Sequence, residues 1–172
     1  IAGIRWIASF AENIKKGITR ANSITVLNNA ETGVPGCIIN TSEISSIRTA
    51  AVTGAVLKKI LSFKDIETPI IIGINGYGPI AKMHIEMLKY VCKDLSYKIK
   101  IYDVNKAIDK SNDDNLTFHD SYEDFFCNAD IFITATNSSE PYIDLRPKKG
   151  SLHLNVSLRD YKSSFIHQTD KI

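Results

Sequence analysis

The sequence predicts an α/β fold in which a Rossmann-like, doubly wound parallel sheet follows part of a smaller α+β domain. From Ile70 onward, short apolar runs alternate with helix-like segments joined by short links, which is typical of parallel strands connected by crossover helices. The run 70–74 is apolar without alternation, as expected of a strand covered on both faces. Before Pro69 the sequence lacks this regular alternation of apolar runs and helix-like segments, so we predict two domains, 1–63 and 64–172.

The first segment contains strand-like and helix-like stretches. Residues 4–8 and 23–27 resemble strands, and 28–36 is rich in turn formers, with a returning strand at 37–40. Thr41, Ser42 and Glu43 offer capping chemistry for a helix over 43–61. The expected buried stripe of this helix consists of Ile44, Ile47, Ala51, Val52 and Ala55, together with Leu57 or Ile60.

The second segment alternates regularly. Its expected strands are 70–74, 98–104, 116–119, 130–137 and 151–157. Its expected helices are 79–91, which tolerates Pro79 in its first turn, a short polar one within 105–115, and 121–129.

Composition excludes several classes of function. The net charge is 21 − 19 = +2, too balanced for a main partner that is nucleic acid or an anionic membrane. No apolar run is long enough to span a bilayer, and no signal peptide is visible. The three distant cysteines fit a reducing compartment, so we expect a cytoplasmic protein. The histidines and cysteines lack metal-ligand spacing, so no metal site is expected.

A glycine turn indicates dinucleotide binding. The pattern Gly76-x-Gly78-x-x-Ala81 follows a buried strand and opens a helix, where backbone amides and the helix dipole favour a pyrophosphate. Asp103 ends the next strand and can accept both ribose hydroxyls of NAD, whereas it would repel the extra phosphate of NADP. An ordinary tight turn and a strand-ending acid are the alternatives.

Arg48 lies on or beside the expected apolar stripe of the helix over 43–61. A charge buried there needs an anion. That anion is either an internal partner, such as Glu31 or Asp65, or the carboxylate of a substrate, which suits the guanidinium fork.

Polar residues follow several of the expected strands. Asp103, Thr136-Asn137 and residues 155–160 should gather with the glycine turn, because ligands bind at the carboxyl ends of parallel strands. There Asp160 could take a proton from a substrate amine as hydride leaves the adjacent carbon; the alternative is a loop or capping acid. For His153 we expect a buried, hydrogen-bonded ring rather than a catalytic one.

With these residues in view, the chain resembles the ornithine cyclodeaminase/μ-crystallin family of NAD(P)-dependent enzymes. The matching stretches are RWIASFAENIKKGITRAN, ETGVPG, SIRTAAVTGA, GYGPIAKMH and LHLNVSLRD, in the family's order. The resemblance implies that Arg48 contacts a substrate carboxylate and also lies at the cofactor, and that Asp160 accepts or donates the proton. Arg5 stands where the family has a substrate-contacting lysine. The implied cofactor contacts are Arg20, Gly76, Gly78, Pro79, Ile80, Asp103, Thr136, Asn155, Val156 and Ser157.

The sequences of these stretches are most similar to one branch of the family, whose dehydrogenases form 2,3-diaminopropionate for siderophores of the staphyloferrin B type and for antibiotics. This resemblance implies NAD-dependent oxidation of N-(2-amino-2-carboxyethyl)-L-glutamate, then hydrolysis of the imine to 2,3-diaminopropionate and 2-oxoglutarate. Cyclodeamination of ornithine to proline and cofactor binding without turnover, as in μ-crystallin, are the alternatives. The family also implies a homodimer formed through the first domain, and chains longer than this one. We therefore expect the sequence to be a fragment whose C-terminal part is missing.

Overall fold

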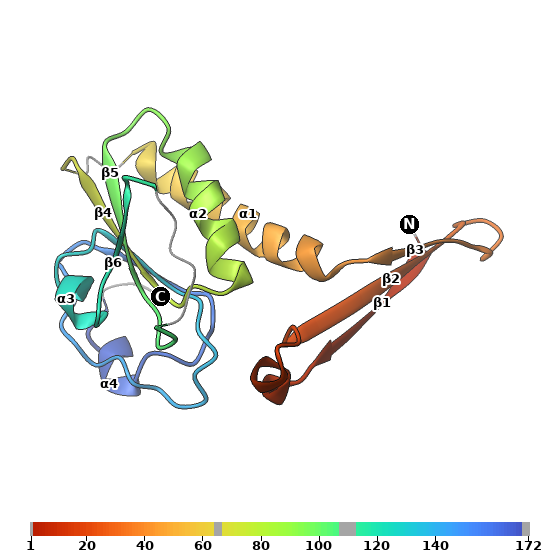
Figure 1. Ribbon diagram of the computed structural model, residues 1–172. Helices are drawn as coiled ribbons and strands as arrows, with labels where there is room; N and C mark the ends of the chain where they lie inside the picture. The colour runs from red at the N-terminus through yellow and green to blue at the C-terminus, as the bar shows by residue number, and fades with distance from the viewer. Residues whose placement is uncertain (1, 64–66, 107–112, 170–172) are drawn as a thin grey trace. The chain divides into compact units, whose positions relative to one another are not determined.

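The computed structural model describes residues 2–63, 67–106 and 113–169 (Figure 1). The chain forms two compact units, Ile1–Arg48 and Thr49–Ile172. The division falls inside helix α1 (Ser42–Leu61), earlier in the chain than the predicted boundary after residue 63. The reason is that the later part of α1 packs with the second unit, where Leu57 is fully buried in the hydrophobic core.

The first unit contains a three-stranded antiparallel sheet in the order β1-β2-β3, which confirms the predicted strands. The strands are β1 (Ala2–Ser9), β2 (Ala21–Asn28) and β3 (Pro35–Asn40), and a 3-10 helix that was not predicted, η1 (Ala11–Lys16), connects the first two. Ile4 pairs with Val26, which pairs with Ile38. Residues paired in this way point to the same face of a sheet, so one face carries an apolar row.

The predicted buried stripe of α1 is wrong for most of its members. Ile44, Ile47 and Val52 are each about half exposed, with relative exposures of 48%, 49% and 57%. The buried positions are instead small or polar ones, namely Ser46, Ala50, Thr53 and Gly54, followed by Leu57. A Cβ at Gly54 would come within 2.8 Å of the Met87 side chain. The contact face was therefore selected for close helix packing, which apolar periodicity does not reveal.

The same shift of face corrects the reading of Arg48, which is exposed and not buried on the helix. Within the described residues it forms no ion pair, including with Glu31, and Asp65 lies outside them. An exposed guanidinium needs no internal anion, so burial gives no support for a substrate clamp at Arg48. The family resemblance remains the basis of that assignment.

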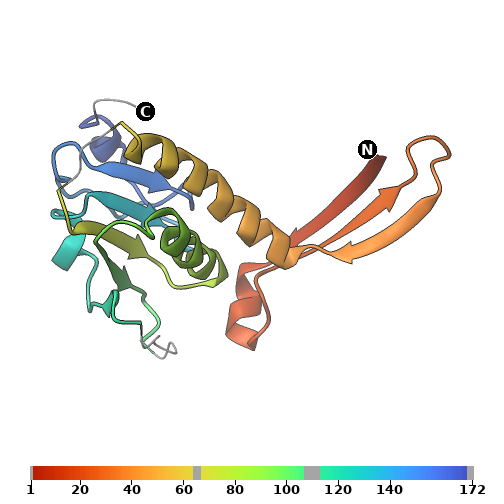
Figure 2. The same ribbon diagram turned by 90° about the horizontal axis from the view of Figure 1, so that it is seen from above.

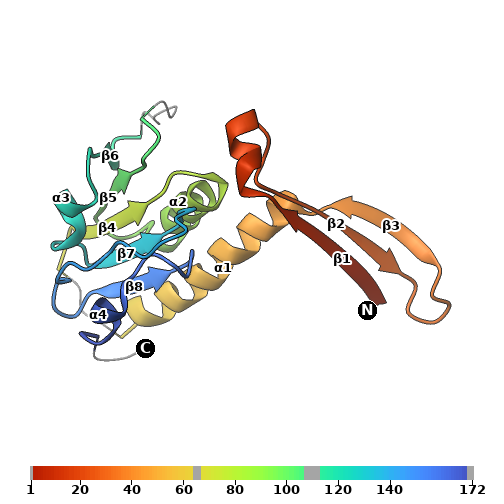
Figure 3. The same ribbon diagram turned by 90° about the horizontal axis from the view of Figure 1, so that it is seen from below.

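The second unit is a doubly wound α/β domain, as predicted (Figures 2 and 3). Its five parallel strands lie in the order β6-β5-β4-β7-β8. They are β4 (Ile70–Asn75), β5 (Tyr97–Tyr102), β6 (Leu116–Phe118), β7 (Ile131–Thr134) and β8 (Leu152–Asn155). The helices are α2 (Pro79–Val91), α3 (Glu123–Phe126) and α4 (Ser163–Ile166). The order reverses direction between β4 and β7, which is the switch point where such sheets bind ligands.

Two hydrophobic clusters cover the two faces of this sheet. Leu57 of α1 and Ala81, Ile85 and Leu88 of α2 pack on one face, and Phe125, Phe126 and Phe165 of α3 and α4 pack on the other. Helix α3 is shorter than the predicted 121–129, and α4 was not predicted. Of the predicted polar helix within 105–115, residues 107–112 lie outside the described residues. The long, strongly patterned elements were thus predictable and the single-turn helices were not.

His153 is enclosed as expected, and it makes the stability of the protein sensitive to acid. Its ring nitrogens lie 3.0 Å from the Ser151 hydroxyl and 2.9 Å from the Tyr161 hydroxyl, and Phe126, Phe132 and Phe165 surround the ring. Burial lowers the pKa of His153 from its ordinary 6.5 to about 4. Between pH 6.5 and about 4, His153 therefore binds a proton in the unfolded chain but not in the folded chain.

We expect the free energy of unfolding to fall as the pH drops from 6.5 toward 4, by on the order of 3 kcal/mol from this group. Urea unfolding at several pH values measures the loss. In His153→Phe the slope should become shallower without vanishing, because burial also lowers the pKa of His84. An unchanged slope in the variant would show that other groups set the acid sensitivity.

Candidate active site

The carboxyl ends of four strands meet in one row. Asn75 of β4 pairs with Tyr102 of β5 on one side and with Thr134 of β7 on the other, and Thr134 pairs with Asn155 of β8. The segments that follow these residues consequently leave the sheet at the same edge. The predicted gathering of Asp103, Thr136 and residues 155–160 around the glycine turn is therefore built into the register.

Gly76 makes a turn that other residues cannot make. Its φ is +96°, a region that favours glycine, and its amide donates to the Tyr102 carbonyl at 2.8 Å. A Cβ at this position would lie 2.4 Å from the Ala135 carbonyl oxygen. The first glycine is thus required by the packing of β4 against the segment after β7.

Gly78 differs from Gly76 in its backbone conformation and in its surroundings. It is the N-cap of α2, its φ of −79° suits any residue, and no side chain caps the helix there. A Cβ built at Gly78 would meet nothing within 4 Å. The protein itself therefore gives no reason for glycine here. We call this open space in front of the N-terminus of α2 the cradle; it fits a pyrophosphate that needs close approach of the backbone.

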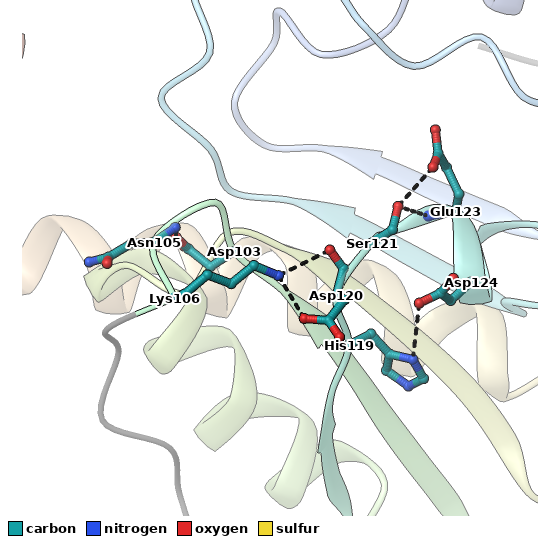
Figure 4. Close-up of polar contacts among 8 residues, drawn as sticks. All are labelled: Asp103, Asn105, Lys106, His119, Asp120, Ser121, Glu123 and Asp124. Atoms are coloured by element: carbon teal, nitrogen blue, oxygen red, sulfur yellow. Dashed lines mark hydrogen bonds and ion pairs between the residues drawn. The ribbon is translucent and has the colours of Figure 1, made fainter.

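Asp103 is tied to the glycine turn. One carboxylate oxygen accepts from the Tyr77 amide at 2.6 Å, and the other accepts from the Asn105 amide at 2.7 Å. Each carboxylate oxygen can accept more than one hydrogen bond, so both retain capacity for ribose hydroxyls. Nearby, the Lys106 ammonium donates to the Asp120 carboxylate at 2.9 Å and links the segments that follow β5 and β6 (Figure 4).

The Asp160 carboxylate lies at the other end of the row and is fully buried. Thr136 and Tyr142 donate their hydroxyl hydrogens to Oδ1, the latter at 3.1 Å, and Ser157 donates to Oδ2. The Asp160 backbone carbonyl accepts the amides of Tyr142 and Ile143 at 2.9 and 2.8 Å. Asp160 therefore joins the segments after β7 and β8 to the loop that carries Tyr142.

An N–H group donates to each of the three hydroxyls that contact the Asp160 carboxylate. The Ser138 amide donates to the Thr136 hydroxyl at 3.2 Å, the Thr136 amide to the Ser157 hydroxyl at 3.1 Å, and the Asn75 side-chain amide to the Tyr142 hydroxyl at 2.6 Å. Each hydroxyl thus accepts from an amide and donates to Asp160. Burial, followed by the nearby Asp160 charge, raises the pKa of Tyr142, which keeps its phenol a donor.

Three predicted site residues belong to the first unit. The Arg5 guanidinium donates to the Ser23 hydroxyl at 3.3 Å and to the Thr41 carbonyl at 3.4 Å. Arg20 lies directly before β2, and its carbonyl accepts the Phe10 amide at 2.9 Å. Arg48 is the last residue of this unit. Their contribution to a site at the edge of the parallel sheet stays a prediction.

Sequence reasoning missed Tyr142 and Asn75. Asn75 is the one polar residue at the end of the buried β4 run and is only 2% exposed. That buried amide was a usable signal, because it must find a partner. Tyr142 lies in a segment without periodicity, and no local pattern indicates its contact with Asp160. Two further residues for which a cofactor contact is predicted make contacts within the protein: Asn155 accepts the Thr134 hydroxyl at 3.1 Å, and Val156 packs against the core.

The comparisons with known proteins identify the family of the chain. The model of the ornithine cyclodeaminase/mu-crystallin family matches residues 1–156. The chain belongs to this family. N-((2S)-2-amino-2-carboxyethyl)-L-glutamate dehydrogenase of Staphylococcus aureus is 30% identical, over all of this chain and 53% of its own length.

Two solved structures share the fold. The crystal structure of CmnK matches 98% of this chain and 51% of its own with a TM-score of 0.80 at 23% identity. Thermococcus litoralis Δ1-pyrroline-2-carboxylate reductase, solved with NADH and L-proline, matches 97% of this chain and 54% of its own with a TM-score of 0.75 at 22% identity. The chain spans about half the length of the curated relatives it matches.

Two searches of the described residues bear on other kinds of site. None of the helices there combines the length and apolar character that crossing a bilayer requires. In the same residues, no group of three or more His, Cys, Asp or Glu side chains is arranged to hold a metal ion.

Proposed function

We propose that the protein is an NAD-dependent amine-oxidising dehydrogenase. It oxidises a C–N centre of an amino acid to an imine, which water then hydrolyses. The substrate we propose is N-(2-amino-2-carboxyethyl)-L-glutamate, and the products are 2,3-diaminopropionate and 2-oxoglutarate. The S. aureus relative, whose name describes this activity, supports the choice of substrate. Siderophore biosynthesis in the cytoplasm is the setting that follows from this proposal.

The observation that carries the proposal is the open cradle at Gly78 in the same row of strand ends as the Asp160 carboxylate. In this arrangement the amides of the glycine turn and the first turn of α2 would hold the pyrophosphate, and Asp103 the adenosine ribose. Thr136 and residues 155–157 would line the nicotinamide end. NAD supplies a hydride acceptor at that end when bound.

The remaining roles fall to the charged side chains. Arg5 and Arg48 would bind carboxylates of the amino acid, for which a guanidinium is suited, and Arg20 and Arg48 would contact the cofactor. Asp160 would receive the proton that the amine loses on oxidation. Arg5 always carries its charge, so at this position it binds the substrate and does not shuttle protons.

The test is an absorbance assay for NADH with the purified full-length protein, NAD and N-(2-amino-2-carboxyethyl)-L-glutamate, with 2-oxoglutarate measured as product. A parallel reaction contains L-ornithine, with proline measured as product. Turnover of the first substrate supports the proposal. Proline formed from ornithine would assign a cyclodeaminase instead. NAD binding in a calorimeter without turnover of either compound would assign a binding protein of the μ-crystallin type.

We also propose that the protein is a homodimer formed through the β1–β3 sheet. On one face of this sheet, Ile4, Trp6 and Ile38 are 67%, 71% and 72% exposed, and an apolar patch of this kind usually marks an interface. Light scattering on the purified protein should give twice the chain mass, and Trp6→Glu should yield monomers. A monomeric wild type would contradict the proposal.

A further inference from the structure

We propose that the Ser157 hydroxyl is the group through which the substrate's proton reaches Asp160, so that Ser157 is a catalytic residue of the proposed amine oxidation. This inference rests on the proposed function. It concerns the route of the proton and not the identity of the substrate. Its starting point is that the accepting carboxylate is fully buried and enclosed by hydroxyl groups.

Enclosure makes a direct transfer to Asp160 impossible without moving one of its partners. Asp160 is 0% exposed, so no substrate atom can touch its carboxylate oxygens, and both oxygens accept hydroxyl hydrogens. The donors on them are Thr136, Tyr142 and Ser157, so a proton from outside must pass one of these three groups. The Tyr142 hydroxyl accepts the side-chain amide of Asn75, which is only 2% exposed, at 2.6 Å. All three donor residues are partly exposed, so the choice among them follows from which carboxylate oxygen each one contacts.

The two carboxylate oxygens differ in a way that favours Ser157. Among the described residues, Oδ1 accepts from both Thr136 and Tyr142, whereas Oδ2 accepts from Ser157 alone. A carboxylate oxygen can accept about two hydrogen bonds, so Oδ1 is fully occupied and Oδ2 keeps room for a proton. A proton therefore settles most readily on Oδ2, and Ser157 is its neighbour.

The backbone beside Ser157 supports a built arrangement. Leu158 has a φ of +68°, a left-handed conformation that a leucine rarely adopts. Such a strained conformation tends to occur at functional sites. Here the turn brings the Ser157 hydroxyl back onto the Asp160 carboxylate.

The step balances as follows. The substrate amine N–H proton moves to Ser157 Oγ as the Ser157 hydroxyl proton moves to Asp160 Oδ2, and hydride leaves the adjacent carbon for NAD. The C=N bond forms from the electron pair of the N–H bond. Ser157 Oγ has one lone pair for the incoming proton, because the Thr136 amide at 3.1 Å occupies only one. The serine is unchanged at the end, and Asp160 holds the proton.

The test compares Ser157→Ala with Ser157→Thr, which keeps a hydroxyl, and with the control Ser62→Ala outside the cluster. For each full-length variant we measure kcat and KM, the NADH dissociation constant by fluorescence titration, and the melting temperature. We expect Ser157→Ala to lose about 100-fold in kcat, with KM and NADH affinity within about threefold of wild type. Ser157→Thr should recover most of the rate, and the control should match wild type.

Two results would overturn the relay. One is a Ser157→Ala kcat within about threefold of wild type. The other is a loss of rate that parallels a loss of NADH affinity or melting temperature, since a serine that only holds the Thr136 amide would give that pattern. In either case wild-type turnover still supports the proposed function. A wild-type protein without turnover of any amino acid would instead remove the proposed function and the relay together.

Discussion

Replacing Gly78 by alanine is expected to weaken NAD binding at least tenfold, about 1.4 kcal/mol, while it leaves the fold nearly as stable as before. The new methyl group enters space in which the protein has no atom within 4 Å. Loss of glycine at an N-cap costs no more than about 1 kcal/mol. The same methyl group would stand where the backbone must approach a pyrophosphate. Calorimetric titration with NAD and urea unfolding measure the two effects.

Gly76→Ala is the matched comparison in the same turn. It should lower the free energy of unfolding by about 2 kcal/mol or more, because alanine at a φ of +96° is strained and its Cβ would meet the Ala135 carbonyl at 2.4 Å. NAD affinity should fall as well, since the turn itself is displaced. If Gly78→Ala binds NAD as tightly as wild type, the cradle is not the pyrophosphate site and the proposed function loses its main support.

The contrast between these two glycines shows what a sequence can predict. The apolar run of β4, the glycine turn and the opening of α2 are specified by adjacent residues, so the pattern was sufficient to predict the turn and its place in the sheet. The sequence did not show that the two glycines of this turn have different roles. Only the neighbours of each Cβ distinguish the glycine that the fold requires from the one it leaves open.

Helix α1 shows why apolar periodicity alone can predict the wrong buried face of a helix. The apolar residues Ile44, Ile47 and Val52 form a convincing stripe, yet the buried face is the one with Ala50, Thr53 and Gly54. Helix packing at close range needs small side chains, and the Thr53 hydroxyl is 3.0 Å from the ring of the buried His84. Hydrophobicity therefore predicted the helix correctly and its orientation incorrectly. The burial assigned to Arg48 failed with it.

The Asp160 cluster has one feature that the sequence predicts and another that only tertiary contacts determine. Its position after β8 followed from the order of the strands, so the acid could be predicted to lie near the glycine turn. Its other members lie partly far away in the chain: Asn75 ends β4, and Thr136 and Tyr142 follow β7, whereas Ser157 is three residues from Asp160. Contacts between segments this far apart in the chain leave no trace in a single sequence.

Asp160→Asn is expected to lower kcat by about 10²–10⁴-fold, the range of general acid–base catalysis, with NADH affinity within about threefold of wild type. The amide has the shape of the carboxylate but not its proton affinity. Its NH₂ group must also face a hydroxyl that donates, which should cost about 1–3 kcal/mol of unfolding free energy. Asp144→Asn, which changes an exposed carboxylate outside the cluster, is the control. A kcat within tenfold of wild type would restrict Asp160 to a structural role.

The double variant Ser157→Ala/Asp160→Asn separates a relay from two independent contributions. If serine and aspartate move one proton in sequence, removal of the acceptor already eliminates the route, so loss of the serine should add less than about threefold to the effect of Asp160→Asn alone. Residues that act as a unit show this non-additivity, whereas independent residues multiply their effects. A double variant slower by the full product of the two single losses would mean that Ser157 contributes by another path, and Asp160 would then need a different contact with the substrate.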